Sequence, residues 1–73
     1  MKNLVIQFEQ LPKLTDPHKW QIGVENELAF ELPEYSFALV WDNDTRLRMC
    51  ITDEHAETAC CLLVNLFGGK ILN

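Results

Sequence analysis

Residues 37–51 are the stretch that decides the fold, FALVWDNDTRLRMCI. Apolar side chains alternate with small or polar ones on both sides of a central turn at residues 43–45, which is the period-two pattern of half-buried β-strands. An antiparallel hairpin with this turn sets apolar residues opposite one another: Phe37 with Ile51, Leu39 with Met49, and Trp41 with Leu47. The stretch therefore predicts two adjacent antiparallel strands that share one apolar face.

The same alternation upstream predicts two further strands. Their apolar positions are Trp20, Ile22 and Val24, followed by Leu28, Phe30 and Leu32. Keeping these sets on one face requires loops at residues 25–27 and 33–36, and Pro33 suits position i+1 of a type I turn. The three turns are compatible with one register, so we expect a meander over residues 20–51.

A strand before the meander and a helix after it complete the expected fold. Leu4, Ile6 and Phe8 alternate with mostly polar neighbours, and residues 10–18, with two prolines, predict a loop. After residue 51 the apolar spacing becomes that of a helix, with one stripe formed by Ala56, Ala59, Cys60, Leu63 and Phe67. Thr52 or Asp53 would cap the start of this helix, and Gly68 would end it.

The predicted fold class is therefore α+β. We expect a four- to five-stranded antiparallel meander sheet with one C-terminal helix packed on one face, which leaves the other face open. Two points stay undecided at this stage. They are the place of the first strand in the sheet and whether residues 70–73 add a short terminal strand.

Size and composition predict a single small domain over residues 1–73. The 73 residues are 48% hydrophobic, and the net charge of -5 opposes contact with nucleic-acid phosphates or anionic lipids. No apolar run approaches the roughly 20 residues of a membrane span, and the first residues lack the apolar core of a signal peptide. Three cysteines, two of them adjacent, suit a reducing compartment. We expect a soluble cytoplasmic protein.

Charge is distributed unevenly along the chain. Residues 20–45 contain no Lys or Arg but six carboxylates: Glu25, Glu27, Glu31, Glu34, Asp42 and Asp44. In the predicted meander, the turns at 25–27 and 42–44 lie at the same end of the sheet, ~10 Å apart, which gathers four carboxylates on one edge. Arg46 would be the nearest cation to Asp42. The edge is either a set of solvated turn residues or a docking surface for a basic protein.

The uncovered sheet face is a second candidate surface. The predicted register places on it Gln21, Gly23, Ala29, Glu31, Ala38, Val40, Arg46, Arg48 and Cys50. This face is more apolar than a fully solvated one needs to be, so it is either an ordinary surface or a face for a homodimer or partner. Ala29, Ala38, Val40 and Arg48 would be central to such an interface.

The sequence gives little support for catalysis or metal binding. Residues 42–44 resemble the start of a calcium loop, but its sixth position would be Leu47 rather than Gly and its twelfth Asp53 rather than Glu. His55 and Cys60 are five residues apart, about 140° around a helix, so they do not share a tetrahedral site. No catalytic triad spacing or phosphate loop is present. We expect no enzyme activity, cofactor or metal, and a partly exposed thiol at Cys61.

These observations lead to two functional hypotheses. The first is a small acidic protein-binding module of the inhibitor type, which docks on a basic, nucleic-acid-binding host or defence protein. In size and composition alone the chain is similar to small acidic inhibitor proteins encoded by phages and other mobile elements. The alternative is a structural homo-oligomer or accessory subunit that assembles through its open sheet face and has no inhibitory role.

Overall fold

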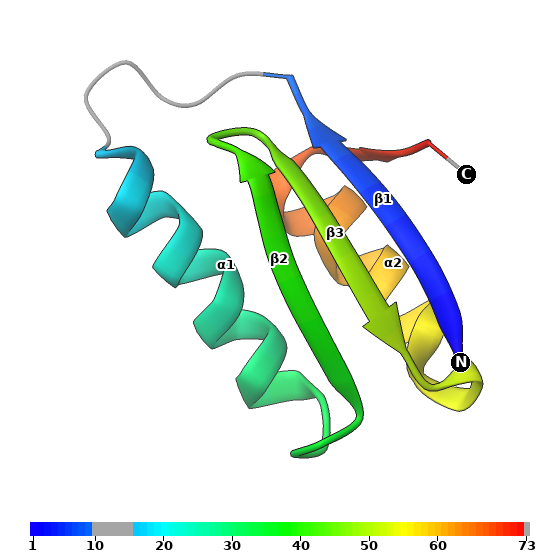
Figure 1. Cartoon of the computed structure of the whole chain (residues 1–73). Coiled ribbons are helices and arrows are strands. Elements are labelled where there is room, and N and C mark those ends of the chain that lie inside the picture. The colour runs from blue at the N-terminus through cyan, green and yellow to red at the C-terminus, as the bar shows by residue number, and fades with distance from the viewer. Residues whose placement is uncertain (10–15, 73) are drawn as a thin grey trace.

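A computed structural model, which describes residues 1–9 and 16–72, has two layers: a four-stranded sheet and two helices on one of its faces (Figure 1). The elements in chain order are β1 (Lys2–Phe8), α1 (Pro17–Glu31), β2 (Phe37–Asn43), β3 (Arg46–Ile51), α2 (Asp53–Phe67) and β4 (Gly69–Ile71). This β-α-β-β-α-β order is the ferredoxin-like, or split βαβ, topology. The fold class is α+β, as predicted, but the sheet is not a meander and there are two helices.

The strand order is β2-β3-β1-β4, and each pair of neighbours is antiparallel. Since β1 and β2 both run antiparallel to β3, they run parallel to each other with β3 between them. Parallel strands need a long crossover connection, usually a helix, and α1 provides it. The strands β3 and β4 lie on either side of β1 and are likewise parallel to each other. The helix α2 provides the crossover connection between them.

The hairpin predicted from residues 37–51 is confirmed. The register pairs Phe37 with Ile51, Leu39 with Met49 and Trp41 with Leu47. The pairing shifts between Trp41 and Asn43, so Asp42 is an extra residue in β2. Such a bulge bends the strand and increases its twist.

The prediction of two strands over residues 20–32 is wrong, because this stretch lies in α1. Asp16 caps the helix by accepting a hydrogen bond from the His18 backbone N–H at 2.9 Å, and Pro17 occupies the first turn, where its missing donor costs nothing. The loop predicted for residues 25–27 is therefore helical. The loop predicted for residues 10–18 falls mostly outside the described residues, and its last residues begin α1.

Spacing explains the error. Residues packed on the core from this segment recur every fourth position, at Trp20, Val24, Leu28 and Leu32. The period-two pattern arose from Ile22 and Phe30, which the helix leaves exposed. Both periods are present in the same thirteen residues, and only tertiary packing selects between them.

The turn over residues 33–36 joins α1 to β2 and does not join two strands. The Ser36 backbone N–H donates to the Pro33 carbonyl at 3.1 Å, so Pro33 occupies position i of the turn and not i+1 as predicted. Tyr35, at position i+2, has a φ of 68°, the sign that a type II turn requires there.

The C-terminal half agrees with its prediction. Thr52 is the N-cap of α2, and Gly68 ends the helix with a left-handed φ of 68°, its N–H reaching the carbonyls of Leu63 and Val64. The chain then forms β4, which answers the question left open for residues 70–73, and β1 lies inside the sheet between β3 and β4. The core packs strand residues against both helices: Leu4, Ile6, Phe8, Leu47, Met49 and Ile51 against Val24, Leu28, Leu32, Ala56, Ala59 and Leu63.

We expect Gly69→Ala to lower the free energy of unfolding by about 1–3 kcal/mol, because an added methyl overpacks the core. A Cβ at Gly69 would lie 2.7 Å from Ile6 Cγ2 and 2.8 Å from Phe8 Cε1, both on buried side chains. Gly23→Ala is the control, since nothing lies within 4 Å of its Cβ position. In a helix that change should raise stability by about 0.5–1 kcal/mol. Urea unfolding measures both, and equal shifts would contradict the packing described here.

Candidate functional site

The structure places the six predicted carboxylates on different elements. Glu25, Glu27 and Glu31 lie on α1, Glu34 lies in the turn after it, and the remaining two, Asp42 and Asp44, lie at the β2–β3 hairpin. The acidic edge was predicted from two neighbouring turns, and one of those turns does not exist. The opposition of Glu27 and Asp42 across two strands is therefore also wrong.

Glu25 serves the packing of α1 on the sheet. It is half-buried, and its Oε1 accepts a hydrogen bond from the Trp41 indole Nε1 at 3.2 Å. One turn earlier, the Gln21 side-chain amide donates to the Asn43 carbonyl at 3.3 Å. These bonds tie the helix to β2, so Glu25 has a role inside the domain.

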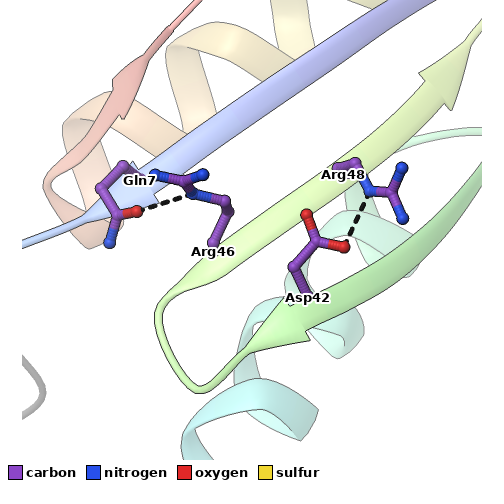
Figure 2. Close-up of polar contacts among 4 residues, drawn as sticks. All are labelled: Gln7, Asp42, Arg46 and Arg48. Atoms are coloured by element: carbon purple, nitrogen blue, oxygen red, sulfur yellow. Dashed lines mark hydrogen bonds and ion pairs between the residues drawn. The ribbon is translucent and has the colours of Figure 1, made fainter.

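Asp42 is also engaged within the molecule. Its Oδ1 accepts a hydrogen bond from Arg48 Nε at 2.8 Å, and the two side chains form an ion pair (Figure 2). Arg46, the cation expected beside Asp42, instead donates from Nε to Gln7 Oε1 at 3.0 Å. The bulge at Asp42 shifts this side chain out of the regular pairing, which a sequence-based register cannot anticipate.

An exposed aromatic pair accompanies two of the remaining carboxylates. Phe30 is 82% exposed and Tyr35 is 89% exposed, at the end of α1 and in the turn that follows. Glu31 and Glu34 are exposed beside them in the chain. We call these four residues the α1 corner. The aromatic residues were missed because Phe30 was assigned to the buried side of a strand. The core residues of this segment recur at every fourth position, and Phe30 is not among them. This spacing is the signal that could have revealed the exposure of Phe30.

The open face of the sheet is built from the residues that alternate with the core. Cross-strand pairing arranges it in three rows: Arg46, Gln7 and Lys70; then Val40, Arg48 and Val5; then Ala38, Cys50 and Asn3. The predicted positions of Ala38, Val40, Arg46, Arg48 and Cys50 on this face are correct. The predicted positions of Gln21, Gly23, Ala29 and Glu31 are wrong, because these residues lie on α1.

This open face is hollowed. A shallow depression of about 640 Å³ lies over β1, β2 and β3, and Val5, Val40 and Arg48 are among its lining residues. Val40 is 53% exposed although its neighbours in β2 pack on the core. No aromatic side chain belongs to the three rows, so the face lacks the stacking platform with which some four-stranded sheets bind single-stranded RNA.

Charge divides between the two layers. The two helices carry six carboxylates and one lysine, whereas the four strands carry four cations and one carboxylate. Three of the strand cations, Arg46, Arg48 and Lys70, are on the open face, together with Asp42. The net charge of -5 therefore conceals an acidic helical side and a basic sheet face.

No family model, curated protein or solved structure matches the chain. The function must therefore be argued from the surfaces described above, since a ferredoxin-like topology serves many unrelated functions.

Cys50, Cys60 and Cys61 are free thiols. Burial raises the pKa of the Cys60 thiol, and the nearby Cys61 and Glu57 raise it further, while Lys2 opposes them. Cys61 is exposed on α2. Within residues 1–9 and 16–72, no three His, Cys, Asp or Glu side chains gather closely enough to hold a metal ion. In the same ranges neither helix has the length and apolarity needed to cross a membrane.

We expect Glu25→Ala to destabilise the fold by about 1 kcal/mol, because the partly buried Trp41 indole N–H loses its acceptor. Glu25→Gln retains an acceptor oxygen and should stay close to wild type. Thermal or urea unfolding compares the two variants. If both were neutral, the bond between Glu25 and Trp41 would have no part in stability.

The two adjacent cysteines should differ in reactivity. At pH 8 and low protein concentration, iodoacetamide should modify Cys61 faster than Cys60, because the raised pKa of Cys60 leaves less thiolate and its side chain is less exposed. Peptide mass spectrometry over time measures both rates. As the pH increases, the ratio of the two rates should fall, since Cys60 then ionises. Equal rates at pH 8 would contradict the environment described for Cys60.

Proposed function

We propose that the chain is a small acidic protein-binding module of the inhibitor type, which docks its α1 corner on a basic protein. The observation that carries this proposal is the near-complete exposure of Phe30 and Tyr35, with Glu31 and Glu34 between them in the chain. The proposal places the protein in the cytoplasm and assigns it no catalytic role and no cofactor.

The exposed aromatic residues are suited to the centre of an interface. Large aromatic side chains bury much area with little loss of rotamer freedom, and they are enriched among residues that dominate binding energy. A phenylalanine at 82% exposure on a helix gains nothing from its position in the isolated domain. Burial against a partner would recover about 1.5–3 kcal/mol for that side chain.

The surrounding charge indicates the chemistry of the partner. Glu31 and Glu34 lie in a stretch, residues 20–45, with no Lys or Arg, and Glu27 and Asp44 belong to the same stretch. Arginine side chains can pair with carboxylates and stack on aromatic faces, so both features of the corner fit an arginine-bearing surface. Nucleic-acid-binding proteins are the obvious class with such surfaces, and occupation of that surface would inhibit them.

The alternative is a structural homo-oligomer or accessory subunit that assembles through the open sheet face. Its support is the depression over β1, β2 and β3 and the exposure of Ala38 and Val40 on it. A chain of 73 residues has a small core, so further burial in an assembly would add stability.

Affinity capture tests the docking proposal. Immobilised wild-type protein should retain a basic protein from lysate of its native host, and the purified partner should then show binding that weakens with salt. The double change Phe30→Gln with Tyr35→Asn should weaken binding roughly a hundredfold, because two aromatic anchors are lost. Glu31→Lys with Glu34→Lys should mainly slow association.

Glu54→Lys with Glu57→Lys is the matched control, since it makes the same change in charge on α2. This control should retain the partner. Undiminished binding by the two corner variants, or capture of an acidic partner, would refute the proposal. Competition between the partner's nucleic acid and this chain would then test inhibition.

A further inference from the structure

The open sheet face changes in charge from one row of residues to the next. The row nearest the hairpin, Arg46, Gln7 and Lys70, is basic, and the next row adds Arg48 between Val40 and Val5. The hydrogen bonds of both arginines use Nε, and Figure 2 shows the terminal nitrogens of both guanidinium groups outside these bonds. The face therefore runs from a basic end to a more apolar one.

The outer face of α2 has the opposite character. Its N-terminal part carries Glu54 and Glu57, and its C-terminal part exposes Val64 and Leu66, which are 42% and 58% exposed. A depression of about 500 Å³ lies along the helix and is lined by both glutamates and Leu66. Glu54 Oε1 lies 3.0 Å from His55 Nε2. No lysine or arginine occurs in α2.

The two surfaces lie on opposite sides of the molecule. The helix α2 packs on one side of the sheet, so its outer face points away from the strands, whereas the open face points in the other direction (Figure 1). A contact between two open faces would bring the three cations of one copy against the same cations of another. A contact between an open face and a helix α2 brings cations against carboxylates.

We propose that the open sheet face is an interface for a second copy of this chain, whose α2 covers it in a head-to-tail contact. Glu54 and Glu57 of one copy then pair with Arg46, Arg48 and Lys70 of the next. Leu66, which lines the same depression as the two glutamates, packs toward Val40 and Val5. This assignment is independent of the docking proposed for the α1 corner, which uses a different surface.

The dimensions of the two surfaces are compatible. From Glu54 to Leu66 the helix rises ~18 Å at 1.5 Å per residue. From Arg46 to Cys50 the open face extends ~13 Å along β3 at 3.3 Å per residue. A standard interface buries ~800 Å² of each partner. The described residues have a total accessible area of 4887 Å², so each copy has ample surface for two such contacts.

Stacking of this kind gives the sheet a helix on each face. Sheets with both faces covered are common in α/β proteins, so the added layer completes a familiar packing arrangement. The contact is heterologous, because each copy uses a different surface on its two sides. Such contacts continue to add copies unless the rotation between neighbours closes a ring.

Sedimentation velocity on the wild-type protein is the first test. Between about 10 µM and about 1 mM, the range of weak association, the mean mass should rise from 8.5 kDa to values above that of a dimer. Raising NaCl from about 0.02 M to about 0.5 M should return it toward the monomer, because the contact depends on charge. Alkylation of Cys61, which lies on the covered face of α2, should slow as the mass increases.

Charge reversal tests which surfaces meet. Arg46→Glu with Lys70→Glu makes the open face acidic, and Glu54→Lys with Glu57→Lys makes the outer face of α2 basic. Each variant alone should remain monomeric, since its two surfaces then carry like charges. An equimolar mixture should associate again, because every contact in an alternating stack joins opposite charges. Glu31→Lys with Glu34→Lys, away from both surfaces, should associate like wild type, and circular dichroism verifies that all variants are folded.

Several results would overturn the assignment. These are a wild-type monomer throughout the concentration range, association that stops at a dimer and strengthens with salt, or a mixture of folded reversed variants that stays monomeric. A salt-strengthened dimer would indicate a contact between two open faces. If the α1 corner variants lose their basic partner while the stacking fails, only the present inference is wrong.

Discussion

The pairing of β3 with both β1 and β2 is the constraint on which the rest of the structure depends. Because each neighbour is antiparallel to β3, β1 and β2 point the same way, and the chain must return along the molecule before β2 begins. Residues 17–31 make this return as a helix. The same constraint moves Glu25 and Glu27 from the sheet edge, where a meander would place them, to the helical layer.

Local and non-local pairing explain how much of the fold could be predicted from the sequence. The pairing of Phe37, Leu39 and Trp41 in the β2–β3 hairpin was predicted correctly, because both strands and their turn lie within fifteen residues. The bulge at Asp42 was not predicted. The helix α2 was predicted from its spacing and from Gly68. The position of β1 depends on partners 39 to 65 residues away, such as Met49 opposite Leu4, and no local pattern contains that information. In α1, the exposed apolar residues Ile22 and Phe30 created a period-two pattern. That pattern concealed the recurrence of the core residues at every fourth position.

The candidate surfaces also differ in how well the sequence predicts them. Ala38, Val40 and Arg48 were assigned correctly to the open face because each alternates with a core residue in a strand that was predicted correctly. The acidic edge was predicted from two neighbouring turns, and one of them, at residues 25–27, lies in α1. The sequence shows how many charges there are, but only the topology shows that the carboxylates collect on the helices and the cations on the strands. That division leaves the molecule with an acidic helical side and a basic sheet face.

The bulge at Asp42 has a further consequence for the outer strand. The strand β2 is the edge of the sheet, has seven residues, and contains neither lysine nor proline, the residues that usually discourage edge-to-edge growth. The extra residue bends the last part of this strand, which makes β2 a poorer template for pairing with a second chain along its full length. A bulge is one of the devices that discourage edge-to-edge pairing of strands, and here a single inserted residue supplies it.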